Sequence, residues 1–153
     1  MAASFSPRRL LSALALTLVI AGIGISTYLT ITHYTEGASL ACPNTGTINC
    51  AKVTSSSYAT LFSLPVALWG LLYFLALLPL YLPFAWRLAD SRVSWLRLGL
   101  IAIGIPIVFW LVYAELFKIN AICLWCTAIH GIVLVLFGIT AFRTALSSES
   151  EGK

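Results

Sequence analysis

The residues best suited to chemistry in this 153-residue chain are its four cysteines, which fall into two pairs. Cys123 and Cys126 form a Cys-x-x-Cys motif, whereas seven residues that include Pro, Gly and Asn separate Cys42 from Cys50. A Cys-x-x-Cys pair that opens a helix is typical of a dithiol that exchanges with disulfides, because the helix N-terminus favours a thiolate. The polar, turn-rich loop around the other pair indicates a disulfide that a second protein can reach.

Three interpretations of these pairs stay open on residue types alone. The first is a redox relay, in which the loop pair exchanges disulfides with a soluble partner and with the Cys-x-x-Cys pair. The second is a non-catalytic multi-pass membrane protein with two structural disulfides. The third is a zinc site with four cysteine ligands, which the wide spacing of Cys42 and Cys50 makes unusual. We favour the relay and expect no metal.

The composition predicts that these cysteines belong to a membrane protein. Hydrophobic residues make up 60% of the chain and charged residues 9%, against roughly 25% charged residues in a soluble domain. The mean hydropathy is +0.97, and the scattered Lys and Arg argue against a nucleic-acid groove. Segments that can span a bilayer cover residues 10–32, 63–84, 97–115 and 121–142. We expect the third to be the shortest and to be kinked at Pro106.

The sequence therefore predicts an all-α fold, an integral membrane bundle of four transmembrane helices over residues 1–146, with a disordered cytoplasmic tail at 147–153. The first apolar run exceeds the core of a removable signal peptide, so we expect this helix to be retained. Seven Lys and Arg fall at the termini and in the middle loop, and only Lys52 and Lys118 in the other loops. Both termini should then face the cytoplasm, and the cysteines the extracytoplasmic side of the cell membrane.

The residues around the Cys-x-x-Cys motif indicate how its thiols are activated. We expect Asn120 to cap the last helix, which would put Cys123 in the first turn. The unpaired N–H groups there, with Lys118 nearby, would lower the pKa of the Cys123 thiol. His130 follows Cys126 by one turn on the same stripe of the helix.

A dithiol that is oxidised repeatedly needs an electron acceptor. The chain has no Gly-rich phosphate loop, and its two histidines make a haem site a poor candidate. A lipid-soluble membrane quinone takes two electrons, which is the number that a dithiol gives. The aromatic residues expected to line a quinone pocket between the helices are Trp69, Tyr73, Phe109, Trp110 and Tyr113.

Together these features resemble the vitamin K epoxide reductase family, in particular its prokaryotic quinone-linked members, over residues 10–142. The resemblance rests on Cys42 and Cys50, on the segments KVTSSSYATLF (52–62) and LPVALWG (64–70), and on CLWC at 123–126. Ala128, Ile129 and His130 stand where vertebrate members carry Thr-Tyr-Ala, so the resemblance carries no implication about epoxide reduction. The implied activity is disulfide generation for oxidative protein folding.

The resemblance also implies roles for single residues and a partner. Cys126 would react with the quinone (ubiquinone or menaquinone), Cys123 would exchange with the loop pair, and Ser56 would hydrogen-bond near the quinone ring, where His130 is also a candidate contact. Residues 55–62 would form a short horizontal helix over the site. Many relatives carry a thioredoxin-like domain fused after the last helix, whereas this sequence ends at Lys153. The implied reductant is therefore a separate thioredoxin-fold protein, periplasmic or extracellular.

Overall fold

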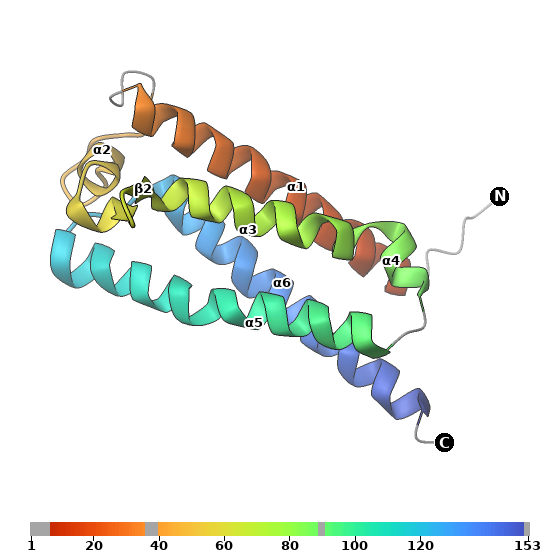
Figure 1. Ribbon diagram of the computed structural model, residues 1–153. Helices are drawn as coiled ribbons and strands as arrows, with labels where there is room; N and C mark the ends of the chain where they lie inside the picture. Colours follow the sequence, from red (N-terminus) through yellow and green to blue (C-terminus); the bar gives the residue numbers. More distant parts are fainter. Residues whose placement is uncertain (1–6, 36–39, 89–90, 152–153) are drawn as a thin grey trace.

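The computed structural model describes residues 7–35, 40–88 and 91–151. The described part is almost entirely helical, with one short hairpin near the cysteines (Figure 1). In chain order the elements are α1 (Pro7–Tyr34), α2 (Cys50–Thr54), the 3₁₀ turn η1 (Ser57–Ala59), β1 (Thr60–Leu61), β2 (Leu64–Pro65), α3 (Val66–Tyr81), α4 (Pro83–Arg87), α5 (Ser91–Tyr113), the π-helix η2 (Ala114–Ile119) and α6 (Leu124–Glu151).

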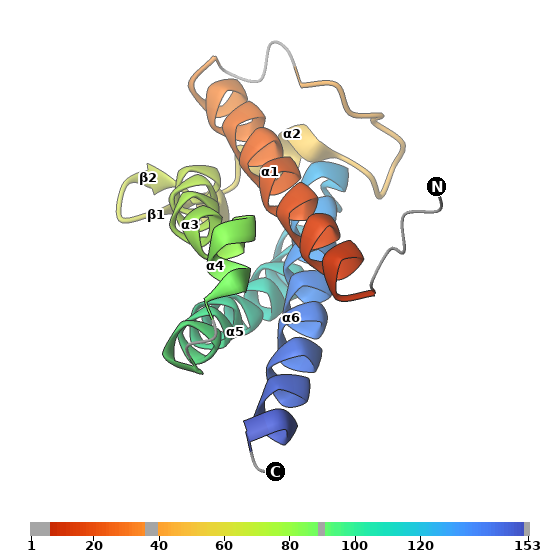
Figure 2. The same cartoon turned by 90° about the vertical axis from the view of Figure 1, so that its right-hand side faces the viewer.

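The long helices form a bundle in which α1 packs on α3 and α6, and α5 packs on α6 (Figures 1 and 2). The core between them consists of buried apolar side chains from every long helix, among them Val19, Phe74, Leu77, Ile101 and Leu136. The start of α1, all of α4 and the end of α6 lie at one end of the bundle, and α2 and the hairpin lie at the other (Figure 1). All four cysteines are therefore gathered at a single end of the molecule.

Three helical segments are long and apolar enough to cross a bilayer: Arg9–Tyr34, Arg92–Ile119 and Leu124–Leu146. Helix α3 is apolar but has 16 residues, or about 24 Å at 1.5 Å per residue. The expectation that the third span is the shortest is wrong, because α5 continues through Pro106 without a break and η2 prolongs it. Large apolar side chains such as Ile20, Phe109 and Phe142 are exposed on the outside of the bundle, as lipid contact requires.

Polar contacts fix the helices at the end away from the cysteines. The hydroxyls of Tyr81 and Thr140 lie 2.6 Å apart in the core and join α3 to α6. The indole ring of Trp86 lies between the guanidinium groups of Arg97 and Arg143, at 3.6 and 3.9 Å from its centre. Buried Arg97 also donates to the carbonyl of Leu80 at 2.9 Å. These contacts satisfy a cation inside an apolar segment.

The last helix continues to Glu151, so the segment 147–153, expected to be a disordered tail, is helical as far as that residue. Gly152 and Lys153 lie outside the described residues.

The segment 55–62 does not form the helix that the resemblance implied. Only the single turn η1 is helical, and the α-helix of this loop, α2, begins five residues earlier at Cys50. Phe62 and Ser63 both have positive φ angles, 52° and 64°, as a two-residue turn between antiparallel strands requires. The resulting hairpin pairs Leu61 with Leu64, and the indole N–H of Trp69 donates to the carbonyl of Leu61 at 3.2 Å.

Two glycines of α1 give a matched test of this packing. A Cβ at Gly22 would lie 2.5 Å from the ring of Phe74, whereas a Cβ at Gly24 would meet nothing within 4 Å. Because Phe74 is fully buried and has little room to move, Gly22→Ala should destabilise the bundle by about 1–3 kcal/mol. Gly24→Ala should not. Thermal unfolding of both variants in detergent, followed by circular dichroism, measures the difference, and equal midpoints would contradict the α1–α3 packing.

Candidate redox site

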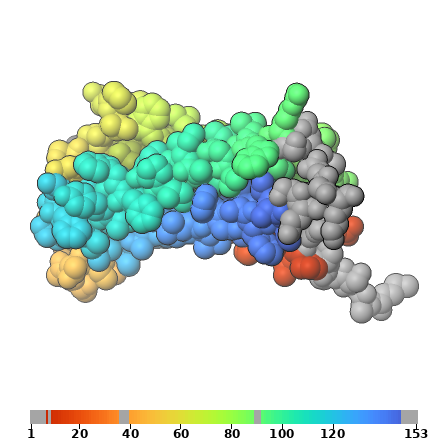
Figure 3. Space-filling view, turned by 90° about the horizontal axis from the view of Figure 1, so that it is seen from below, coloured from red at the N-terminus to blue at the C-terminus, as the bar shows by residue number. Residues whose placement is uncertain are grey.

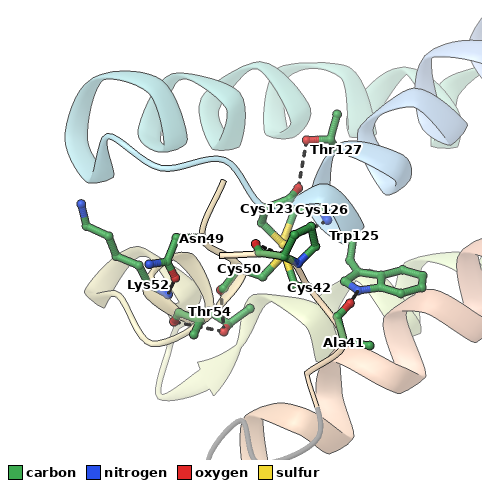
Figure 4. Close-up of a disulfide and its surroundings, with 12 residues drawn as sticks. Ala41, Cys42, Asn49, Cys50, Lys52, Thr54, Cys123, Trp125, Cys126 and Thr127 are labelled. Atoms are coloured by element: carbon green, nitrogen blue, oxygen red, sulfur yellow. Dashed lines mark hydrogen bonds between the residues drawn. A yellow bond between two sulfur atoms is a disulfide. The ribbon is translucent and has the colours of Figure 1, made fainter. Parts of the chain in front are cut away.

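A short backbone bridge holds the cysteine loop against the start of α6. The N–H of Ile122 donates to the carbonyl of Thr47 at 2.9 Å, and the N–H of Asn49 donates to the carbonyl of Ile122 at 3.1 Å. Cys50 and Cys123 follow these residues directly in the two chain segments, and both are buried in one apolar cluster. Figure 4 shows the four sulfur-bearing side chains gathered at this point. The bridge thus brings the two cysteine pairs together, as the relay requires.

The loop pair is joined as a disulfide, with the Cα atoms of Cys42 and Cys50 6.1 Å apart. Its two sides differ in accessibility, since Cys50 is 1% exposed whereas Cys42 is half-buried. Asn49 caps α2 by accepting the N–H of Lys52 at 2.9 Å, which fixes the backbone at Cys50. One end of this disulfide is therefore open to water, and the other faces the protein interior.

The accessible end of the loop is fixed through Ala41. The indole N–H of Trp125 donates to the carbonyl of Ala41 at 2.9 Å, and the N–H of Ala41 donates to the hydroxyl of Tyr28 at 2.7 Å. The two aromatic rings also contact each other, with centroids 5.2 Å apart. Trp125, the residue before Cys126 in the motif, thus fixes the backbone next to Cys42.

The start of α6 differs from the expected one. Asn120 ends η2 in a left-handed conformation, φ 51°, and does not cap α6. Cys123 occupies the cap position itself. Its sulfur accepts the N–H of Cys126 at 3.3 Å, and its carbonyl accepts the N–H of Thr127 at 2.9 Å. A sulfur at this position meets the unpaired N–H groups of the first turn directly.

This geometry lowers the pKa of the Cys123 thiol below that of an ordinary cysteine. The chief cause is a hydrogen bond from the Cys126 thiol, helped by the N–H of Cys126 and opposed by burial and by Glu115. The expected help from Lys118 is not observed, because its ammonium group lies over the ring of Tyr113, 5.9 Å from the centroid. The Cys126 thiol, helped by the N–H groups of the helix start, therefore favours the Cys123 thiolate.

A cavity of about 820 Å³ opens beside the other cysteine of the motif. Cys126 lines it and Cys123 does not. Its wall is mostly apolar and comes from α1, the η1–hairpin segment, α3, α5, η2 and α6. Figure 3 shows the outer face of the molecule along α5, with the loop residues and η2 at the cysteine end. Both sulfurs of the Cys-x-x-Cys motif thus lie in the cluster of the loop disulfide, and Cys126 in addition lines an apolar cavity.

Most of the expected pocket residues lie in the wall of this cavity. They are Ser56, Trp69, Tyr73, Trp110 and His130. Tyr113 and Phe109 do not line it. Phe109 and Tyr113 are both exposed on the outside of the bundle, where the Tyr113 ring stacks on Phe117 with centroids 5.2 Å apart.

The hydroxyl groups in the wall differ in their hydrogen bonds. Tyr73 donates to the backbone of Leu100 at 3.3 Å, and Ser56 donates to the carbonyl of Val53 at 2.7 Å. Ser26 is fully buried, and within the described ranges its hydroxyl is the one buried side-chain polar atom without a partner. A bound molecule with an oxygen acceptor would satisfy it.

Sequence reasoning missed Glu115 and Ser26. Glu115 is 6% exposed, lines the cavity and accepts the N–H of Cys123 at 3.3 Å. A sequence signal for it exists, since a single carboxylate inside an apolar segment marks a functional site by default. Ser26 has no such signal, because serines inside apolar helices usually bond to their own backbone.

The ionisation of Cys123 can be tested directly. Since the Cys126 thiol is the chief cause of the lowered pKa, Cys126→Ala should raise the pKa of Cys123 towards the ordinary value. In the reduced protein the thiolate of Cys123 should form at lower pH than in this variant. Thiolate ultraviolet absorbance against pH measures both, with Cys123→Ala as the control that removes the step at lower pH. A low-pH step that persists in Cys123→Ala would contradict the assignment.

The family comparison agrees with this arrangement. Residues 13–141 match the model of the vitamin K epoxide reductase family. The match begins in α1 and ends in α6, so it includes both cysteine pairs and the cavity wall. The chain belongs to the vitamin K epoxide reductase family.

Proposed function

We propose that this membrane thiol–disulfide oxidoreductase passes electrons from a thioredoxin-fold protein to a membrane quinone, and so generates disulfides for oxidative protein folding. One observation carries the proposal: both cysteines of the motif pack in the cluster that holds Cys50, and Cys126 also lines an apolar cavity. Two purely structural disulfides would not require an apolar cavity beside Cys126.

The cavity fits a quinone ring in size and chemistry. Pockets for molecules of that size measure roughly 300–1,000 Å³ and combine apolar walls with a few polar groups, and this cavity measures about 820 Å³. Ser26 offers an unpaired hydroxyl, and His130 and Ser56 are further polar residues of the wall. When bound, a quinone accepts the two electrons and two protons that a dithiol releases.

The accessibility of the loop disulfide supports different roles for its two sulfurs. Half-buried Cys42 is the sulfur that a partner thiolate attacks, which forms a mixed disulfide and releases the thiolate of Cys50. Cys50 lies in the same buried cluster as Cys123 and is the sulfur that attacks the Cys123–Cys126 disulfide at Cys123, releasing Cys126. The second thiolate of the partner then attacks its own sulfur in the mixed disulfide, which leaves the partner oxidised and frees Cys42. Attack of Cys42 on Cys50 restores the loop disulfide and frees Cys123. Two electrons have moved from the partner, through the loop pair, to the helix pair.

The described cysteines match the point that follows this transfer. Cys42 and Cys50 are joined, whereas Cys123 and Cys126 are free thiols. In the next step the free pair closes its own disulfide as the two electrons leave for the quinone, with Cys126 on the cavity side.

The membrane orientation is part of the proposal. We place both termini in the cytoplasm and the cysteines on the extracytoplasmic side, because Lys and Arg gather at the end of the bundle away from the cysteines. Helix α3 would be the fourth span in spite of its 16 residues, since α4 follows it and the bilayer tolerates short spans by local thinning.

Removal of Cys126 tests the quinone step. In Cys126→Ser the reduced protein should lose quinone-dependent thiol oxidation, because the sulfur on the cavity is absent. Free thiols are counted with a maleimide reagent before and after a membrane-soluble quinone is added under anaerobic conditions, with the wild-type protein as control. Unchanged thiols in the wild type would support structural disulfides. Full turnover in Cys126→Ser would remove the role assigned to Cys126.

Replacement of Cys42 tests the assignment of the loop sulfurs. Cys42→Ser should abolish turnover with a thioredoxin-fold reductant, because the accessible sulfur is lost. A small dithiol that reaches the helix pair directly should still support quinone reduction. Rates with both reductants are compared in Cys42→Ser and in the wild type, and an equal loss with both would defeat the relay.

A further inference from the structure

Glu115 lines the cavity and accepts a hydrogen bond from the cysteine motif. The relay proposed for the cysteines gives no role to this carboxylate. We infer that its carboxylate carries protons from the thiols of Cys123 and Cys126 to the oxygens of a quinone in the cavity. This inference rests on the proposed function and adds to it the path of the protons.

The backbone at Glu115 is shaped to bring its side chain to the cysteines. The π-helix η2 ends with the N–H groups of Asn120 and Ala121 both donating to the carbonyl of Glu115, the second at 3.1 Å. Asn120 adopts a left-handed conformation to close this turn. The chain therefore reverses within a few residues, and the Glu115 carboxylate accepts the N–H of Cys123 at 3.3 Å. Single π-helical turns inside α-helices are frequent at functional sites.

The surroundings of Glu115 suit a proton carrier better than a surface charge. It is 6% exposed, and the N–H of Cys123 is its side chain's one hydrogen-bond partner in the described part of the chain. No other Asp or Glu occurs in the helical segments that are long enough to span a membrane. Burial of a carboxyl group without a cation is costly, so a purely structural cap would be served as well by Asn or Gln.

Glu115 also shares the cavity wall with one of the two sulfurs. Cys126 of α6 lines the same cavity. The remaining titratable side chains of the wall come from other helices or lie further along α6: His33 of α1, Tyr58 of η1, Tyr73 of α3 and His130 of α6. Of all these groups, Glu115 alone combines a place on the cavity with a hydrogen bond to the cysteine motif.

The step balances in protons and electrons. When Cys123 and Cys126 close their disulfide, two electrons leave the sulfurs and reach the quinone, and each sulfur loses one proton. The Glu115 carboxylate takes the first proton, becomes the neutral acid and donates that proton to a quinone oxygen. It is then a carboxylate again and carries the second proton in the same way, so the products are one disulfide and one quinol.

A readout that needs no quinone tests whether Glu115 changes protonation with the thiols. Quinone-free protein is cycled between dithiol and disulfide with a small dithiol and a small oxidised disulfide, and infrared difference spectra are recorded in the carboxylic-acid C=O region. We expect a redox-dependent band that Glu115→Gln removes. Glu151→Gln, which changes an acidic residue outside the span Leu124–Leu146, should retain it. A missing band in the wild type, or a band that persists in Glu115→Gln, would overturn the inference.

Quinone-dependent thiol oxidation is then compared between variants. Glutamine keeps an oxygen for the N–H of Cys123 but cannot carry a proton, so Glu115→Gln should be slower by roughly 100-fold, the scale of general acid–base catalysis. Glu115→Asp keeps the carboxylate and should recover part of the rate and the infrared band. If Glu115→Gln oxidised its thiols at the wild-type rate, this inference would be overturned, whereas the proposed quinone function would stand. No thiol oxidation in the wild type would overturn the proposed quinone function, and the inference with it.

Discussion

The backbone bridge between the cysteine loop and the start of α6 is the contact on which the redox site depends. Its two hydrogen bonds join Ile122 to Thr47 and Asn49, and each contributes only about 1 kcal/mol. Their importance is positional, because they bring Cys50 into one buried cluster with Cys123. Trp125 and Tyr28 add a second attachment at Ala41, so that the loop is held on both sides of its disulfide.

The helix start at Cys123 then separates the two sulfurs of the motif. As the cap residue, Cys123 turns its sulfur back to the first turn, where it accepts the N–H of Cys126. Cys126, inside the helix, lines the cavity instead. A spacing of three residues keeps the sulfurs close enough to bridge, while one faces the loop and the other faces the place proposed for a quinone. The same local geometry thus serves thiol exchange and electron delivery.

Several details of the site could not be obtained from the sequence, for physical reasons. Asn120 is a good capping residue by type, but the π-helical turn uses it to end the preceding helix. Tyr113 is aromatic and near the motif in sequence, yet it points outwards. An apolar helix has no polar face, so its sequence does not show how it is rotated about its own axis. Glu115 was detectable as an intramembrane carboxylate, but its contact with Cys123 depends on a chain reversal that no sequence period encodes.

Hydrophobic length and cysteine spacing are properties of the linear chain, so they were enough to predict the helical membrane class, the two cysteine pairs and the family. Most of the side chains expected around a quinone also lie in the cavity wall, among them Ser56, Trp69, Tyr73 and His130. Three-dimensional packing was needed to show which loop sulfur is buried, which motif sulfur lines the cavity and which hydroxyl lacks a partner. These depend on contacts between distant segments, as between Ala41 and Trp125, which are 84 residues apart, and on the rotation of each packed helix about its own axis.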